Sequence, residues 1–266
     1  MKEKVILISI DGMRPDGFLQ CGHPFVKQML EQFSFCLQAR SVVPPVTLPC
    51  HTSIFYGVEP ARHGIITNQY HPPVRPIRGL AEQLEAAGSI NAAFYNWEPM
   101  RHVWQSGSMK YSLYVDAYQQ ENTDAFLTGQ AIDLIERVQP DFVYLYLVET
   151  DDKGGHDCGW MTEEYLRRVA NAIDCVQRVF EAAGENYHIF VTADHGGHGR
   201  DHGEDCPEDM TIPMFFYGRC FEKGKQLEGL NLMDLAPTIA SLMGANLSRE
   251  WEGNDWSERS EERRVG

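Results

Sequence analysis

The chain has 266 residues, of which 43% are hydrophobic and 23% are charged, as is ordinary for a soluble globular protein. That length suits one large α/β domain with its own hydrophobic core, so disulfide bonds are not needed for stability. Asp and Glu number 38 and Lys and Arg 23, giving a formal charge of −15 that disfavours nucleic-acid polymers and anionic membranes as partners. Ten histidines accompany this excess of carboxylates, which raises the alternative that some of the acids are metal ligands.

Apolar runs alternate with helical patterns along the chain. In chain order the sequence predicts strand 5–10, helix 25–33, strand 35–42, helix 79–87, strand 91–95, helix 123–138, strand 142–148, helix 162–183, strands 188–192 and 212–217, and helix 232–243. Strands 5–10, 142–148 and 188–192 are almost continuously hydrophobic, which is typical of strands buried on both faces of a sheet. Together the elements predict a doubly wound, mostly parallel α/β sheet sandwiched by helices.

We expect a single domain over residues 1–248. The segment 70–118 is rich in proline and aromatic residues and has the least regular pattern, so we interpret it partly as a small irregular insert or cap over the sheet edge. Residues 249–266 are polar and charged, which predicts a disordered tail.

The start of the chain and its cysteines bear on the cellular compartment. The first apolar run, 5–10, is shorter than the hydrophobic stretch of a secretory signal and far below the roughly 20 residues that span a membrane. The seven cysteines are scattered, and no two form a CxxC pair. We therefore expect a cytoplasmic protein with free thiols and no membrane partner.

Acidic residues and histidines follow the three strongest strands. Asp11 follows the first, Asp151 and Asp152 follow the second, and Asp194 and His195 follow the third. A single aspartate at the end of a strand is usually a helix cap or a turn former. Three strands that each deliver such residues to one edge predict a ligand site, because open parallel sheets bind ligands past the carboxyl ends of their strands.

Two segments have the composition of metal-binding loops. Asp152 and His156 are four residues apart around two glycines, so one carboxylate and one imidazole can reach the same ion. The segment 192–203 holds three histidines, two aspartates and four glycines. Oxygen and imidazole ligands without thiolate suit Zn²⁺, Mn²⁺ or Fe. The alternative is a solvated histidine-rich loop that binds metals non-specifically.

A nucleophile is predicted at the start of another helix. In the segment 44–54, Thr47 is a good N-cap and Pro49 suits the first turn. A helix N-terminus favours phosphate, and a threonine hydroxyl there can serve as a nucleophile when a metal deprotonates it. The alternative is that Thr47 only caps the helix.

Together these segments resemble the alkaline phosphatase superfamily, and most closely its type I phosphodiesterase/nucleotide pyrophosphatase branch. The resemblance extends from residue 10 to about residue 244, and its motifs occur in the family's order. The matching segments are 10–16, 46–51, 59–68, 152–156, 192–196, 202–205 and 233–239. A sulfatase is disfavoured, because the segment 47–51 begins with threonine and lacks the arginine of the sulfatase motif.

The resemblance implies an alkaline phosphatase-like fold with two divalent metal ions, zinc being favoured and Mn²⁺ or Fe being alternatives. The ligands that it implies are Asp11, Thr47, Asp194 and His195 for one ion and Asp152, His156 and His202 for the other. It further implies that Thr47 is the nucleophile and that Asn68 contacts a phosphoryl oxygen. Two alternatives stay open, with Asp151 in place of Asp152 and His198 in place of His202.

The expected function is that of a two-metal phosphoester hydrolase of the phosphodiesterase/nucleotide pyrophosphatase type. It would act on a small phosphoester through a covalent phosphothreonine at Thr47. Alternatives are a phosphomonoesterase or phosphonate hydrolase of the same superfamily and, from another class, a metal-binding member of the fold without catalysis.

Overall fold

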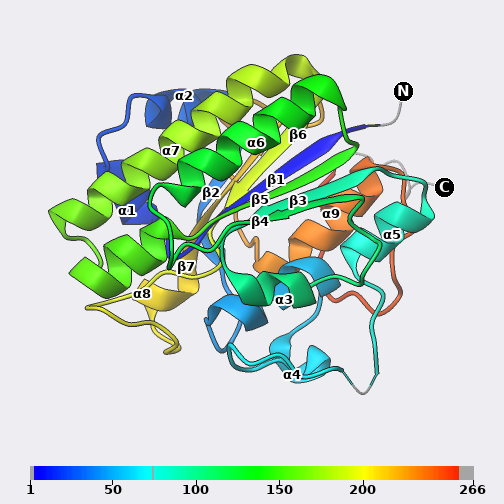
Figure 1. Ribbon diagram of the computed structural model, residues 1–266, viewed down its shortest axis with the longest axis horizontal. Helices are drawn as coiled ribbons and strands as arrows, with labels where there is room; N and C mark the ends of the chain where they lie inside the picture. Colours follow the sequence, from blue (N-terminus) through cyan, green and yellow to red (C-terminus); the bar gives the residue numbers. More distant parts are fainter. Residues whose placement is uncertain (1–2, 74, 258–266) are drawn as a thin grey trace.

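The computed structural model describes residues 3–73 and 75–257, which form a seven-stranded sheet between two layers of helices (Figure 1). The strands are β1 (Val5–Ile10), β2 (Ser34–Arg40), β3 (Asn91–Tyr95), β4 (Tyr111–Tyr114), β5 (Phe142–Leu147), β6 (His188–Thr192) and β7 (Thr211–Tyr217). Their order across the sheet is β2-β7-β6-β1-β5-β3-β4. The five strands from β6 to β4 are parallel, and β7 runs antiparallel to both of its neighbours. The predicted α/β class is therefore confirmed.

Helices cover both faces of this sheet. They are α1 (Pro15–Gln20), α2 (Phe25–Gln32), α3 (Thr47–Tyr56), α4 (Pro60–His63), α5 (Leu80–Ala86), α6 (Thr123–Arg137), α7 (Glu163–Ala183), α8 (Pro207–Met210) and α9 (Leu235–Leu242). Shorter helical turns are η1 (Glu98–His102), η2 (Thr150–His156), η3 (Gly184–Asn186) and η4 (Leu232–Asp234). Helices α1, α2 and α6 pack with α7 on one side, and α3, α5 and α9 pack together on the other (Figure 1).

The three central strands form the hydrophobic centre of the molecule. Every residue of β1, β5 and β6 is buried, as their continuous apolar runs predict. The long helix α7 covers them with an amphipathic face on which Tyr165, Val169 and Val176 are buried. Its first turn is capped by Thr162, whose side chain accepts a hydrogen bond from the Tyr165 N–H. The sheet therefore presents the carboxyl ends of three rigid, adjacent strands at one edge.

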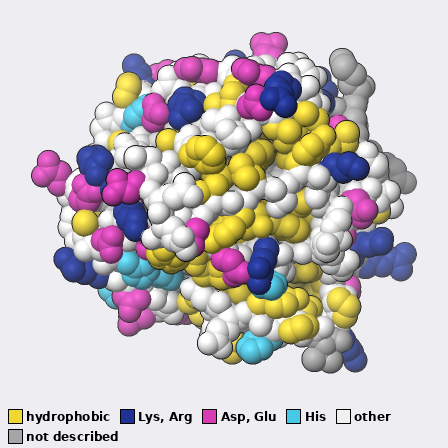
Figure 2. Space-filling model, viewed as in Figure 1, with side chains coloured by type: hydrophobic (Ala, Val, Ile, Leu, Met, Phe, Trp, Pro, Cys, Tyr) yellow, Lys and Arg dark blue, Asp and Glu magenta, His cyan; other side chains and the backbone are white. Residues whose placement is uncertain are grey.

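The segment 70–118, which we interpret partly as an insert, contributes two strands to the sheet. It contains α5, β3 and β4, with β3 pairing with β5 and β4 with β3. The sequence gives no apolar run for β4, because Tyr111 and Tyr114 are each 38% exposed at the sheet edge. Figure 2 shows the surface of the molecule in the view of Figure 1. Hydrophobic side chains gather across the middle of this surface, and most charged side chains lie toward its margins.

The segment 249–257 is folded, so the prediction of a disordered tail is wrong for these residues. The Trp256 indole donates a hydrogen bond to Asp234 at 3.0 Å, and its backbone N–H donates to the Thr238 hydroxyl at 3.0 Å. The Trp251 ring lies against Gly57, where α3 ends in a left-handed conformation. Residues 258–266 of the predicted tail lie outside the described residues.

The seven cysteines all lie in described residues, and the structure places none of them in a disulfide bond. Within residues 3–73 and 75–257, no helix is both long enough and apolar enough to cross a membrane.

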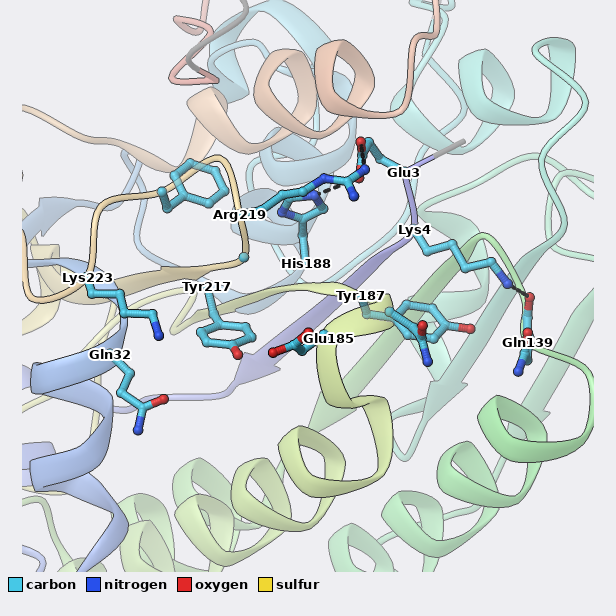
Figure 3. Close-up of a pocket in the computed structure, with 13 residues that line it drawn as sticks. Glu3, Lys4, Gln32, Gln139, Glu185, Tyr187, His188, Tyr217, Arg219 and Lys223 are labelled. Atoms are coloured by element: carbon cyan, nitrogen blue, oxygen red, sulfur yellow. Dashed lines mark hydrogen bonds and ion pairs between the residues drawn. The ribbon is translucent and has the colours of Figure 1, made fainter. Parts of the chain in front are cut away.

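A cavity of about 550 Å³ lies at the amino ends of β1 and β6 (Figure 3). Glu3, His188 and Arg219 form an ion-paired cluster there, which we call the amino-edge cluster. None of the predicted site residues lines this cavity, because all of them lie beyond the opposite ends of the strands, in α3 or in the loop after α4.

Candidate metal centre

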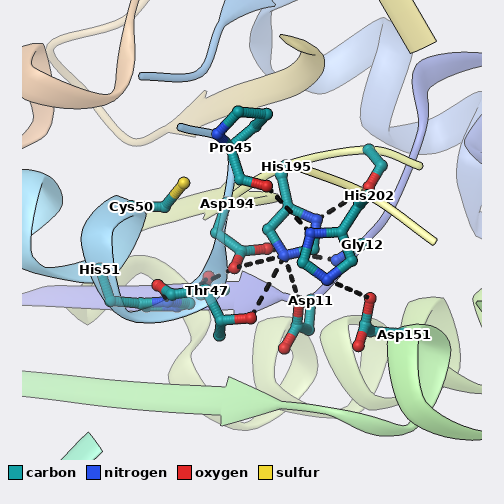
Figure 4. Close-up of polar contacts among 12 residues, drawn as sticks. Asp11, Gly12, Pro45, Thr47, Cys50, His51, Asp151, Asp194, His195 and His202 are labelled. Carbon is teal, nitrogen blue, oxygen red and sulfur yellow. Dashed lines mark hydrogen bonds and ion pairs between the residues drawn. The ribbon is translucent and has the colours of Figure 1, made fainter. Parts of the chain in front are cut away.

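The carboxyl ends of the three central strands bring the predicted aspartates together. Asp11 directly follows β1, Asp151 lies four residues beyond β5, and Asp194 lies two residues beyond β6. All three side chains are buried, and they surround His195 and His202 (Figure 4). The structure therefore brings acidic residues from three strand ends together at the sheet edge where parallel α/β proteins bind ligands.

His195 lies at the centre of a first group of donor atoms. Its Nε2 is 3.2 Å from Asp11 Oδ1, 3.3 Å from Asp194 Oδ2 and 3.3 Å from Thr47 Oγ1. Its Nδ1 lies 2.8 Å from the Gly196 carbonyl, which can only accept, so Nδ1 carries the proton. The Nε2 of the neutral ring therefore presents a lone pair to two carboxylates. Such converging lone pairs fit a cation between them.

The carboxylates of this group each have one satisfied and one orphaned oxygen. Asp11 Oδ2 accepts a hydrogen bond from the Tyr146 hydroxyl, and Asp194 Oδ1 accepts one from the Gly12 N–H at 3.2 Å. Asp11 Oδ1 and Asp194 Oδ2 are buried without a hydrogen-bond partner, as is Asp151 Oδ1. Buried carboxylate oxygens are costly when unpaired. These three orphaned atoms therefore fit a metal-binding role.

The sequence predicts Thr47 as the N-cap that precedes α3. In the structure Thr47 is instead the first helical residue. Val46 is the N-cap, and its side chain makes no capping hydrogen bond. The first helical bond, from the Cys50 N–H to the Val46 carbonyl, shows the same boundary. The Thr47 hydroxyl is consequently not used as a cap, and it lies against His195 instead. This placement weakens the alternative that Thr47 only starts the helix.

Asp151, His156 and His202 form a second group. Asp151 Oδ2 is 3.4 Å from His156 Nε2, and Asp151 Oδ1 is 3.9 Å from His202 Nε2. Both imidazoles are held as in His195, with Nδ1 at 2.9 Å from a backbone carbonyl, that of Arg200 for His156 and that of Pro45 for His202. All three rings therefore turn Nε2 toward the carboxylates, as metal-ligating histidines do.

The structure brings Asp151, rather than Asp152, to this group. The Asp152 carboxylate pairs with Lys153 at 2.9 Å. The reason is local, because η2 is a π-helix, in which hydrogen bonds join residues five apart. Residues 151 and 156 then share one side of the turn, whereas a spacing of four does not. His198 pairs with Asp209 at 2.7 Å, so His202 is the histidine that the structure places beside Asp151.

The buried charges shift the ionisation of the whole centre. Burial, together with Asp194 and Asp151, raises the pKa of Asp11 well above its usual value. Burial and the charge of Asp151 raise the pKa of Asp194 to about 8. Burial also depresses the pKa of His195, whereas the hydrogen bond to Asp151 raises the pKa of His156 to about 9. The centre thus carries more negative charge than the protein neutralises.

Asn68 lies beside the start of α3, as the resemblance implies. Its Oδ1 accepts a hydrogen bond from the Leu48 N–H at 2.9 Å. Its amide oxygen is therefore engaged, and the NH₂ group is left as a donor for a ligand. The side chain is exposed, so a ligand can reach it from solvent.

Two residues outside the predicted ligand set support the centre, namely Tyr146, which was missed in the sequence, and His51, which the sequence indicates only as a structural residue near the Thr47 motif. Tyr146 of β5 donates to Asp11, although it reads as one more apolar residue of a buried strand. His51 is fully buried, with Nδ1 at 2.8 Å from the Thr47 carbonyl and Nε2 at 3.0 Å from the Ser9 hydroxyl. The spacing of four residues between Thr47 and His51 on one helix was the signal that could have identified it.

The indole of Trp160 packs against both ligand-bearing loops. Its Nε1 donates to the Gly12 carbonyl at 2.9 Å, and its ring meets those of His156 and His202 edge-on, at centroid distances of 5.3 and 6.0 Å. A Cβ atom on Gly155 or Gly197 would lie within 2.5 Å of this ring. Both glycines are therefore required for the close approach.

A parallel α/β sheet with a threonine at a helix start and aspartate–histidine groups at its carboxyl edge defines the alkaline phosphatase-like class. Residues 5–205 match the type I phosphodiesterase / nucleotide pyrophosphatase family. The chain belongs to this family, so the resemblance seen in its motifs is confirmed.

Its curated relatives are distant and longer. Human ectonucleotide pyrophosphatase/phosphodiesterase family member 1 is 24% identical over 217 residues, covering 72% of this chain and 23% of the relative. Human bis(5'-adenosyl)-triphosphatase ENPP4 is 24% identical over 270 residues, covering 91% of this chain and 55% of the relative. The chain thus spans between 23% and 55% of the length of these two proteins.

Solved structures show the same fold. Murine ENPP5, as an inactive threonine-to-alanine variant in complex with AMP, matches with a TM-score of 0.81 at 16% identity, covering 97% of this chain and 99% of that one. The 2-O GAG sulfatase BT1596 matches with a TM-score of 0.76 at 15% identity, covering 96% and 73%. At these identities the likeness establishes the fold, and the chemistry has to be argued from the site.

Proposed function

We propose that this chain is a two-metal phosphoester hydrolase of the phosphodiesterase/nucleotide pyrophosphatase type, with Thr47 as its covalent nucleophile. One observation carries the proposal. His195 Nε2 presents its lone pair to three oxygen atoms that lie within 3.3 Å of it. They are the Thr47 hydroxyl and the two carboxylate oxygens of Asp11 and Asp194 that have no hydrogen-bond partner. A buried helix start alone would need none of these neighbours.

The two donor groups would hold one divalent ion each. The first comprises Asp11, Thr47, Asp194 and His195, and the second comprises Asp151, His156 and His202. Nitrogen and oxygen donors without thiolate favour Zn²⁺, with Mn²⁺ or Fe as alternatives. When bound, such ions supply Lewis-acid activation and neutralise charge that develops at phosphorus.

Thr47 would carry the phosphoryl group between two displacements. Its Oγ1, having released its proton to water, bonds to phosphorus as the bond to the leaving oxygen breaks, and that oxygen then takes a proton from water. In the second step, a water oxygen bonds to phosphorus and loses its protons to solvent. The Oγ1–P bond breaks, and Thr47 regains its hydroxyl proton.

Hydrogen-bond donors at the start of α3 would bind the non-bridging phosphoryl oxygens. The first N–H groups of a helix have no acceptor within the helix, and the positive end of the helix dipole lies there. The Thr47 N–H is such a group, and the Asn68 amide beside it has only its NH₂ left to donate. Both donors stabilise charge at phosphorus without reorganisation.

Small nucleotide esters are the substrate class that the relatives support. Murine ENPP5 was solved with AMP, and ENPP4 is named for bis(5'-adenosyl) triphosphate. For this chain, the formal charge of −15 also opposes a nucleic-acid polymer. We therefore propose a small phosphoester as its substrate and, from the sequence features above, a cytoplasmic location.

The test compares Thr47→Ala with Thr47→Ser. Each variant is assayed with Zn²⁺ or Mn²⁺ on bis(p-nitrophenyl) phosphate, p-nitrophenyl phosphate and a phosphonate monoester. We expect the alanine variant to lose roughly 10³-fold or more in kcat, because it removes the atom that bonds to phosphorus, and the serine variant to retain turnover. Thr52→Ala is the matched control, since that hydroxyl lies in the same helix and donates to the Leu48 carbonyl.

Three results would contradict or redirect the proposal. An unchanged kcat in Thr47→Ala excludes the covalent step. Metal binding without turnover of any of the esters favours a non-catalytic metal-binding protein. Preference for the monoester or the phosphonate over the diester identifies another member of the superfamily.

A further inference from the structure

A separate group of donor atoms lies on the loop that carries His202 and on α8, the short helix that follows it. His198 Nδ1, Cys206 Sγ and a carboxylate oxygen of Asp209 all lie within 4.8 Å of one another. His198 belongs to the histidine-rich loop after β6, Cys206 immediately precedes α8, and Asp209 lies in α8. None of these residues belongs to the two donor groups of the metal centre.

Asp209 is a rigid, buried member of this group. Its side chain has no solvent exposure, and its Oδ2 accepts hydrogen bonds from the N–H groups of Gly203 and Glu204, both at 2.9 Å. The backbone carbonyl of Asp209 accepts from the Gly196 N–H at 2.7 Å. These bonds fix the carboxylate and leave Oδ1 facing His198.

The donors are close to the arrangement that a single tetrahedral ion requires. His198 Nδ1 lies 3.8 Å from Cys206 Sγ and 2.7 Å from Asp209 Oδ1. Nitrogen and sulfur ligands of one zinc ion lie about 3.6 Å apart, and nitrogen and oxygen ligands lie about 3.4 Å apart. The first distance already agrees, and the second needs a small outward turn of His198, which is 41% exposed and free to make it.

The charge around this group is negative. Glu204 Oε2 is 4.0 Å from His198 Nε2, and Glu208 adds a second carboxylate close enough to act on the ring. A proton shared between His198 and Asp209 now occupies the point on which the donors converge. A divalent cation at that point would neutralise more of the surrounding charge.

We propose that His198, Cys206 and Asp209 form a third cation site, specific for a thiophilic divalent metal such as Zn²⁺. Binding replaces the proton on His198 Nδ1 and the proton of the Cys206 thiol, and both are released to solvent. The donor atoms are an imidazole nitrogen, a thiolate sulfur and a carboxylate oxygen. Water takes the fourth position on the exposed side.

The site would brace the loop that carries His202. Asp209 already bonds to the backbone on both sides of this loop, at Gly196 next to His195 and at Gly203 next to His202. A metal that joins Asp209 to His198 and Cys206 closes the same loop at two further points. Its role is therefore structural, and it is independent of whether the centre at Thr47 catalyses phosphoester hydrolysis.

The experiment uses Co²⁺ alone as the probe, added to the full chain after EDTA treatment and dialysis. A cysteine ligand gives a near-ultraviolet thiolate-to-cobalt charge-transfer band, which the nitrogen and oxygen ligands of the other two groups do not give. We expect the band in the wild type, its loss in Cys206→Ser and in His198→Gln, and its retention in Cys21→Ser. Cys21 is the matched control, because it is a half-buried thiol that donates to the Phe18 carbonyl.

A variant of the metal centre separates this proposal from the proposed function. Asp151→Asn should keep the band, whatever happens to its phosphoester turnover. A wild-type chain without the band, or a band that survives in Cys206→Ser, overturns the third site.

A second measurement needs no variant. Alkylation of each cysteine in the wild type is followed by mass spectrometry with and without Zn²⁺. We expect Zn²⁺ to slow the modification of Cys206 and to leave that of Cys21 unchanged. An unchanged rate at Cys206 also overturns the proposal.

Discussion

The two edges of the central strands use the same kinds of buried side chain in opposite ways. At the amino edge, Glu3 accepts hydrogen bonds from Arg219 and from His188 Nε2, the latter at 2.9 Å (Figure 3). At the carboxyl edge, the ion pairs found for Asp11 and Asp194 among the described residues involve only histidines (Figure 4). Arg219 supplies a cation at the first edge, whereas no lysine or arginine in the described part of the chain pairs with Asp11 or Asp194 at the second.

Ionisation follows this difference. Although burial alone would raise the pKa of Glu3, the hydrogen bonds from Arg219 and His188 lower it. At the other edge, burial and neighbouring carboxylates raise the pKa of Asp11 and Asp194. A buried acid–imidazole cluster is therefore a candidate metal site when its imidazoles turn lone pairs inward and no arginine pairs with its carboxylates.

The largest expected effect is on the free energy of unfolding of the metal-free protein, which should depend on pH through the carboxyl edge. The pKa of Asp194 rises from 3.8 to about 8 on folding, so the unfolded chain releases this proton at lower pH than the folded one. Its contribution to stability is present at acidic pH and is lost as the pH rises toward 8. Between pH 5 and 8 we expect this one group to lower the free energy of unfolding by up to ~4 kcal/mol, relative to a chain without it.

Urea unfolding of EDTA-treated protein measures this slope. Asp194→Asn should flatten it, because the amide has no proton to release, and added Zn²⁺ should restore the wild-type stability at pH 8. The same pH dependence in the metal-free wild type and in Asp194→Asn would break the comparison.

The next effect separates two adjacent carboxylates. Asp151→Asn should lower kcat/KM roughly 100-fold or more, because charge stabilisation by a metal is worth several kcal/mol. Asp152→Asn should leave it nearly unchanged, since Asp152 pairs with Lys153 on the rim of the centre. Steady-state assays of the pair, with metal content measured on both, make each the control for the other. The reverse ranking would show that the π-helical turn does not set the ligand.

The smallest effect belongs to the amino edge. Glu3→Gln should reduce the free energy of unfolding by about 1–3 kcal/mol, because Arg219 and His188 lose a charged acceptor. The pKa of Glu3 is lowered in the folded state, so its contribution is present above the usual carboxyl range and is lost as the pH falls. Thermal melts at pH 7 and pH 4 measure both terms. A loss of phosphoester turnover in this variant would contradict the separation of the two edges.

The central sheet and the carboxyl-edge residues could be predicted from the sequence, because full burial leaves a continuous apolar run and a strand end leaves polar residues after it. Strands β1, β5 and β6 have such runs, and Asp11, Asp194 and His195 follow them. Strand β4 could not be predicted, since an edge strand with exposed tyrosines has no apolar run. The folded segment 249–257 is polar in sequence and is anchored by two tryptophans.

The identity of the second carboxylate could not be predicted for a different reason. Motif spacing assumes one helical geometry, and the spacing of four between Asp152 and His156 fits an α-helical or turn-like loop. The chain winds into a π-helix at that point, which shifts the matching position by one residue. Nothing in residues 150–156 marks this choice, because it depends on how the turn packs against Trp160 and α7.

The position of Trp160 gives the protein an intrinsic optical reporter. Its indole touches the imidazoles of both loops edge-on, and its N–H is fixed on the Gly12 carbonyl. A cation that binds His156 or His202 changes the electric field at this fluorophore without moving it. Emission from Trp160 should therefore follow metal occupancy directly, so that loading of the second donor group can be titrated in the unlabelled wild-type chain.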